Sequence, residues 1–114
     1  MPDPNVLDVK ELVDRIGGDE EFALELLQEF RASLDQEVLE LKATLDGGNP
    51  QAVSEKRHAL KGSALNLSAK AFASVAKIME HAGKDGDLAT ATGQYPQLLS
   101  ETERLKEAID SLPA

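Results

Sequence analysis

The sequence predicts an all-α fold, an antiparallel up-down four-helix bundle with a short additional N-terminal helix. Apolar residues recur at three- and four-residue steps through several long segments, and no segment keeps the two-residue alternation of a strand. The connections between these segments are short, which makes long amphipathic helices antiparallel neighbours. At 114 residues the chain can bury one modest core. We therefore expect residues 1–114 to form a single domain.

Capping residues and helix breakers set the boundaries of five predicted helices. Asp8, Asp19 and Asp87 each precede a periodic segment and can accept a hydrogen bond from its first turn. Asn49 followed by Pro50 combines a cap with a proline at the first helical position. The longest helix is expected to bury an apolar stripe of Phe22, Leu26, Leu27, Phe30, Leu34, Val38, Leu41 and Leu45. The predicted helices cover roughly residues 8–16, 20–45, 50–67, 70–82 and 88–112.

Two features concern the last two helices. Residues 83–87 contain two glycines and are predicted to form a loop, which ends the fourth helix near residue 82. Pro96 removes the donor to the carbonyl of Thr92 and should kink the last helix. The alternative is a pair of helices joined at Pro96.

Composition narrows the class of function. The net charge of −9 argues against a nucleic-acid partner, because phosphates need a basic surface. Residues 51–84 differ from the rest: they hold six cations and two carboxylates, a net +4, while the remainder holds six and nineteen, a net −13. There is no cysteine for a disulfide or a thiolate metal site. The longest apolar stretches are only a few residues long, so we expect no membrane-spanning segment. We expect a cytoplasmic location.

The run Arg57-His58-Ala59-Leu60-Lys61-Gly62-Ser63-Ala64 is the most informative part of the chain. On a helix, positions i, i+3 and i+4 share one face, so His58, Lys61 and Gly62 would place an imidazole, a cation and a bare position together. His58 falls about 160° from Leu60 on a helical wheel and is expected to be exposed. This arrangement suits an imidazole that accepts a phosphoryl group from a large partner.

Two neighbours of His58 fit such a docking face. A mid-helix glycine costs about 0.5–1 kcal/mol against alanine, so close approach of a partner is the expected reason for Gly62. Leu65 is apolar on the same exposed face and is expected to form part of a docking patch. His81, the other histidine, lacks the Lys-Gly context and is read as idle, and a His58–His81 metal pair is not expected.

The run resembles the signature of the histidine-containing phosphotransfer (HPt) domain: His, any residue, Leu, Lys, Gly, then Ser or Ala. The resemblance continues through Asn66-Leu67-Ser68-Ala69, where the family usually has glycine in place of Ser68, and upstream through residues 15–22. It covers most of residues 7–112. It implies that Lys61 contacts phosphoryl oxygens and that Glu80 accepts a hydrogen bond from the imidazole Nδ1. Arg57, Gly62, Leu65 and Lys84 are then the expected partner-binding residues.

The predicted function is that of a phosphorelay intermediate: His58 accepts a phosphoryl group from a receiver-domain aspartate or a kinase and passes it to another receiver. The partners implied are response-regulator receivers and a sensor or hybrid histidine kinase, with Mg²⁺ expected on the receiver and no cofactor on this chain. The chain lacks the nucleotide-binding glycine loop GxxxxGK[ST], so we expect a phosphocarrier rather than a kinase. We also expect a monomer. The alternative is a four-helix module that binds a receiver without accepting phosphate. An acyl carrier is disfavoured, since no Asp-Ser-Leu tripeptide occurs.

Overall fold

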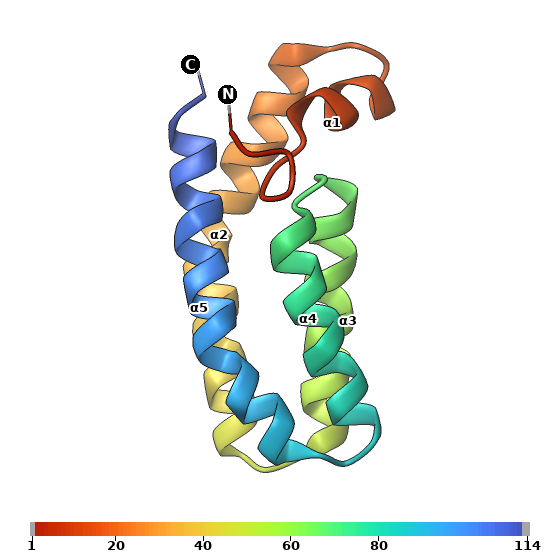
Figure 1. Ribbon diagram of the computed structural model, residues 1–114, viewed down its shortest axis with the longest axis vertical. Helices are drawn as coiled ribbons and strands as arrows, with labels where there is room; N and C mark the ends of the chain where they lie inside the picture. Colours follow the sequence, from red (N-terminus) through yellow and green to blue (C-terminus); the bar gives the residue numbers. More distant parts are fainter. Residues whose placement is uncertain (1, 113–114) are drawn as a thin grey trace.

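The protein folds into five α-helices (Figure 1). In the computed structural model, residues 2–112 are described, apart from the side chains of Pro50, Ser54 and Arg57. The helices are α1 (Val9–Arg15), α2 (Glu20–Asp46), α3 (Pro50–Asn66), α4 (Lys70–Lys84) and α5 (Leu88–Asp110). No strand occurs between residues 2 and 112. The predicted all-α fold is confirmed.

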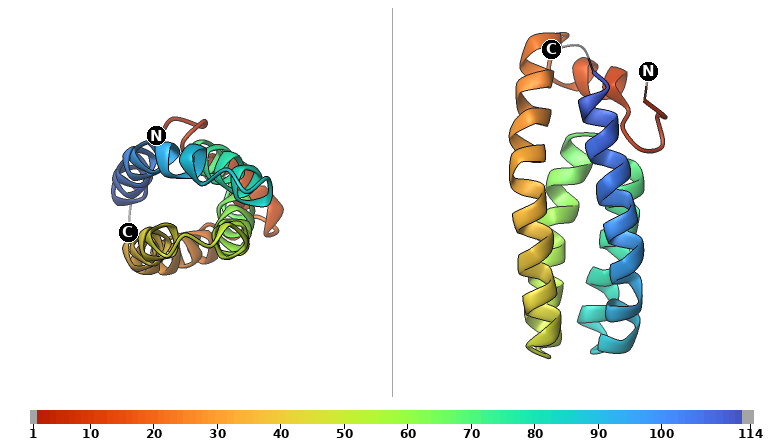
Figure 2. Two further views of the ribbon diagram at one scale, coloured as in Figure 1. Left: turned by 90° about the horizontal axis from the view of Figure 1, so that it is seen from below. Right: turned by 90° about the vertical axis from the view of Figure 1, so that its left-hand side faces the viewer.

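Helices α2 to α5 form an up-down bundle, and the molecule as a whole measures 41 × 21 × 20 Å. The view along the bundle shows the four helices arranged around a common interior (Figure 2, left). The short helix α1 lies across one end, against α2 and the turn that joins α3 to α4. No helix in the described part of the chain is long and apolar enough to cross a membrane.

The predicted caps begin four of the helices. The side chains of Asp8, Asp19 and Asp87 accept hydrogen bonds of 2.9–3.0 Å from the amides three residues on. The Asn49 side chain accepts from the amides of Gln51 and Ala52 at 3.0 and 3.3 Å. Each cap satisfies amide donors that the first helical turn leaves unpaired.

The buried stripe of α2 follows the predicted spacing from Leu27 to Leu45, but Phe22 departs from it. Phe22 is 46 % exposed, whereas Leu27, Leu34 and Leu41 are fully buried. The buried positions at this end of α2 are Ala23 and Leu27, and Phe22 lies about 100° and 140° from them around the helix, outside the buried face. The prediction that Phe22 lies in the core is wrong.

The prediction for residues 83–87 is wrong in part, because α4 continues through Gly83 to Lys84. Gly83 is buried within the helix. The turn is therefore confined to residues 85–87, with Gly86 at φ +75°. The two-helix alternative at Pro96 is also wrong, because α5 is a single helix that contains Pro96. Its first turns lean toward α4 (Figure 1).

A polar cluster fixes α1 to the turn between α3 and α4. Ser68 has a left-handed φ of 60° and is buried, and its hydroxyl donates to Glu11 Oε1 at 2.9 Å. The Asp8 amide donates to the Ser68 carbonyl at 3.1 Å. Arg15 Nη1 donates to the carbonyls of Leu65 and Asn66 at 2.9 and 2.6 Å. These bonds hold the turn that sets the relative position of α3 and α4.

Candidate functional site

His58 lies in the middle of α3 with its imidazole directed away from the core. Its side chain is 72 % exposed, whereas Leu60 and Ala64 on the opposite side of the helix are buried. The Nδ1 atom lies 2.8 Å from Oε2 of Glu80 on α4. The two residues are 22 positions apart in the chain, and the antiparallel packing of α3 against α4 brings them together.

Glu80 is the centre of the site, with three partners around one buried carboxylate. Only 2 % of its surface is exposed. In addition to His58, Lys61 Nζ donates to Oε1 at 3.0 Å, and Lys84 Nζ lies 3.6 Å from the same oxygen. A buried carboxylate is costly unless it is paired and hydrogen-bonded, and here both oxygens have partners.

These partners decide the protonation of Glu80. Burial by itself raises the pKa of the carboxyl group, but the hydrogen bonds from Lys61 and His58, together with the charges of Lys61 and Lys84, outweigh burial and lower the pKa to about 2. The carboxylate is therefore ionised at neutral pH.

The charge on Glu80 determines which imidazole nitrogen of His58 carries hydrogen. An ionised carboxylate only accepts hydrogen bonds, so Nδ1 must be the donor in the 2.8 Å contact. In the neutral imidazole the lone pair then lies on Nε2. The geometry thus leaves an exposed histidine with its free lone pair on Nε2.

The surface next to His58 has no side chain at Gly62 and an exposed apolar side chain at Leu65. A Cβ atom added to Gly62 would meet no atom within 4 Å, so no contact within the described residues requires a glycine there. Leu65, one turn further along α3, is 50 % exposed. The side chain of Arg57, also predicted to bind the partner, lies outside the described residues.

Lys61 and Lys84 are both at the site, in different surroundings. The Lys61 side chain is 19 % exposed and lies against Glu80, while that of Lys84 is 58 % exposed. The sequence analysis had placed Lys84 in a loop. As the last residue of α4 it instead stands one turn beyond Glu80.

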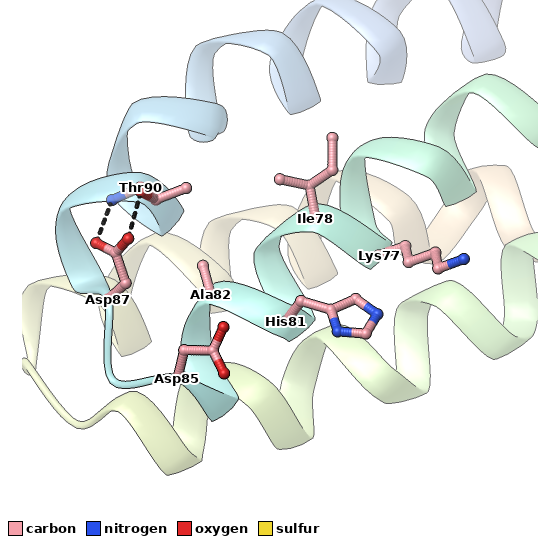
Figure 3. A pocket seen from close by; sticks show the side chains of 7 residues that line it. All are labelled: Lys77, Ile78, His81, Ala82, Asp85, Asp87 and Thr90. Carbon is pink, nitrogen blue, oxygen red and sulfur yellow. Dashed lines mark hydrogen bonds between the residues drawn. The ribbon is translucent and has the colours of Figure 1, made fainter.

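His81 is exposed and separate from this cluster. It borders a shallow pocket of about 350 Å³ that Figure 3 shows, between α4 and the start of α5, together with Asp85 and Thr90. No hydrogen bond links His81 to His58 or Glu80 among the described residues. The same residues contain no group of three or more His, Cys, Asp and Glu side chains positioned to hold a metal ion.

The sequence analysis missed the deep burial of Glu80 and the inward turn of Lys61. On a helical wheel Glu80 falls at the flank of the apolar stripe of its helix, a position that gives no sign that α3 covers it. One signal was present: three cationic or imidazole side chains lie within reach of a single carboxylate once α3 and α4 pair antiparallel. Such a carboxylate can stay charged when it is buried.

A comparison with known protein families identifies the family of the chain. The family model described as the Hpt domain matches residues 25–112, a range that includes His58, Lys61 and Glu80. No curated protein and no solved structure gives a significant match. Hpt domains are phosphocarrier modules of two-component phosphorelays, carry the phosphoryl group on histidine, and interact with receiver domains and kinases. Since the match spans well over half of the 114 residues, the chain belongs to the Hpt domain family.

Proposed function

We propose that Nε2 of His58 accepts a phosphoryl group from the aspartyl phosphate of a receiver domain or from a kinase, and then passes it to another receiver. The observation that supports this most directly is the contact between His58 Nδ1 and the buried Glu80 carboxylate. It fixes the tautomer and leaves Nε2, on an exposed ring, as the free nucleophile.

The chemistry balances without a cofactor on this chain. The Nε2 lone pair forms a bond to phosphorus as the bond between phosphorus and the aspartyl oxygen breaks, and the leaving group is the receiver's carboxylate. The proton on Nδ1 stays in place, so the ring becomes positively charged and the Glu80 carboxylate stabilises it. Mg²⁺ on the receiver is expected to offset charge on the equatorial phosphoryl oxygens.

Lys61 and Lys84 add positive charge at this centre. The ammonium of Lys84 is mostly exposed and 3.6 Å from Glu80 Oε1, so we assign it to the incoming phosphoryl oxygens. Lys61 is more enclosed and donates to Glu80, so it holds the carboxylate in position and also contributes its charge to the phosphoryl group. Gly62, Leu65 and Arg57 would form the docking surface around them.

Transfer from a radiolabelled phosphoreceiver tests the proposal. The wild-type chain should take up label that is stable in base and labile in acid, as a phosphoramidate is. His58→Gln should take up none, and His81→Gln, the matched control, should take up label like the wild type. Label retained by His58→Gln would overturn the assignment of His58. A wild-type chain that binds the receiver without becoming labelled would instead be a non-phosphorylated binding module.

A further inference from the structure

One cation near the site has no part in the cluster around Glu80. Lys77 lies three residues before Glu80 on α4, about 4.5 Å along the axis. At about 100° per residue it is about 60° around α4 from Glu80 and about 20° from Lys84. Lys84 is exposed and lies 3.6 Å from Glu80, which contacts α3. Lys77 is exposed on the same side of α4 as Lys84, so it faces solvent next to α3.

The position of Lys77 relative to α3 follows from the antiparallel pairing. His58 contacts Glu80, so three residues earlier on α4 corresponds to three residues later on α3. Lys77 is therefore level with Lys61 and Gly62. At this level a Cβ atom added to Gly62 meets no atom within 4 Å among the residues that the structure describes. A partner that comes close over Gly62 would pass beside Lys77.

Lys77 is also unusual in lacking an ion-pair partner. Among the eleven lysine and arginine side chains that the structure describes, nine pair with a carboxylate of this chain, and the exceptions are Lys10 and Lys77. The chain has 21 carboxylate residues for 12 cations, so carboxylates are in excess. Lys77 is exposed, and Figure 3 shows that it leaves α4 on the same side as His81.

We propose that Lys77 is a docking residue whose ammonium pairs with a carboxylate on the receiver domain, at the edge of the contact surface around His58. The inference rests on the proposed function and adds the charge of the partner: the receiver presents an acidic side chain opposite the level of Gly62. A charge at the rim of an interface acts mainly on association, and salt weakens it. Lys77 therefore sets how readily a given receiver is recognised, and has no part in the phosphoryl transfer step.

Charge reversal with a matched control tests this. Lys77→Glu and Lys10→Glu each change the net charge by −2, and both remove an exposed lysine without an ion pair, but Lys10 lies on α1 at the end of the bundle. With a phosphorylated receiver at low salt, Lys77→Glu should lower kcat/KM roughly 5- to 10-fold through KM, and this loss should shrink at high salt. Lys10→Glu should stay near the wild type. Lys77→Ala should give a smaller loss in the same direction.

The outcomes separate this inference from the proposed function. A wild-type chain that takes up no phosphate refutes the function itself. If the wild type is active and the Lys77 and Lys10 variants behave alike, only net charge matters and Lys77 is not a docking residue. A fall in kcat at unchanged KM would place Lys77 in the transfer step and would also overturn the proposal. Circular dichroism of each variant checks that the fold is retained, and Lys77→Ala carries the test if Lys77→Glu does not fold.

Discussion

At the scale of single side chains, the contact of Glu80 with His58 Nδ1 is the feature that we expect to control the imidazole. Glu80→Ala removes the acceptor for Nδ1–H, so the imidazole should shift toward the Nε2–H tautomer, which has no lone pair on the attacking atom. Transfer should slow without being abolished, because His58 stays exposed. Nitrogen NMR of His58 and the transfer rate are measured together. Glu80→Gln serves as the matched variant: its amide oxygen can still accept from Nδ1–H, so the tautomer should be kept while the stabilising charge is lost.

If neither the tautomer balance nor the rate changes in Glu80→Ala, the carboxylate does not orient His58.

The same residue should make stability depend on pH in the acid range. The folded-state pKa of Glu80 is about 2, below the ordinary 4.5, so its contribution is complete above pH 4.5 and is lost as the pH falls toward 2. Between pH 6 and pH 2.5 the wild type should lose on the order of 2–3 kcal/mol of unfolding free energy through this group. Glu80→Gln cannot titrate and should lose correspondingly less. Urea unfolding of both proteins at the two pH values measures the difference, and equal losses would show that Glu80 is not held ionised.

At the scale of the helices, we expect a substitution of Gly62 to raise the free energy of unfolding and to lower the rate of phosphoryl transfer. The site can hold a side chain without a clash inside the chain, so Gly62→Gln should raise the free energy of unfolding by about 0.5 kcal/mol through better helix propensity. It should also slow transfer strongly, because the new side chain projects toward the receiver. Gly93→Gln is the control: Gly93 is exposed in α5, also with nothing within 4 Å of an added Cβ.

The control should become more stable and keep its transfer rate. Unchanged transfer in Gly62→Gln would mean that this glycine is only a weak point of α3. Melting temperature and transfer rate are sufficient measurements for both variants.

Both the helices and their approximate ends could be read from the sequence, since each predicted bound lies within two residues of the observed one. Local signals account for the successes, since a cap such as Asp19 acts within three residues and an apolar stripe repeats within one helix. The failures depended on distant parts of the chain. Phe22 has the spacing of the predicted stripe, but the side of α2 that packs against the rest of the molecule at this end carries Ala23 and Leu27 instead. Lys84 lies beyond a glycine, a residue that often marks a helix end, but α4 continues through the buried Gly83.

Across the whole molecule, α1 is attached to the end of the bundle by contacts that no periodicity predicts. Arg15 reaches carbonyls 50 and 51 residues away at the end of α3, where helix carbonyls lack partners. Arg15→Ala should lower the free energy of unfolding by about 1 kcal/mol. Lys42→Ala, which breaks an exposed pair within α2, should cost no more than about 0.5 kcal/mol. Chemical denaturation compares them, and equal effects would show that Arg15 does not tie α1 to the bundle.

The arrangement of the site is also a property of the whole bundle. The sequence showed that His58, Lys61 and Gly62 share a face, because those residues lie within one turn of each other. The level of Glu80 relative to His58 follows only from the antiparallel pairing of α3 with α4, since the two residues are 22 positions apart. The rotation of α4 about its axis, which buries Glu80 and brings Lys84 to 3.6 Å from it, depends on packing against both α3 and α5. Patterns within one helix cannot supply that rotation.

The central claim is that Glu80 holds Nδ1–H so that Nε2 of His58 receives the phosphoryl group. Nitrogen and phosphorus NMR of the protein after phosphorylation by its receiver tests this most directly, because coupling to phosphorus identifies the bonded ring nitrogen. We expect a single phosphohistidine, at His58, with phosphorus bonded to Nε2 and hydrogen retained on Nδ1. Phosphorus bonded to Nδ1 of His58, or found on His81, would contradict it.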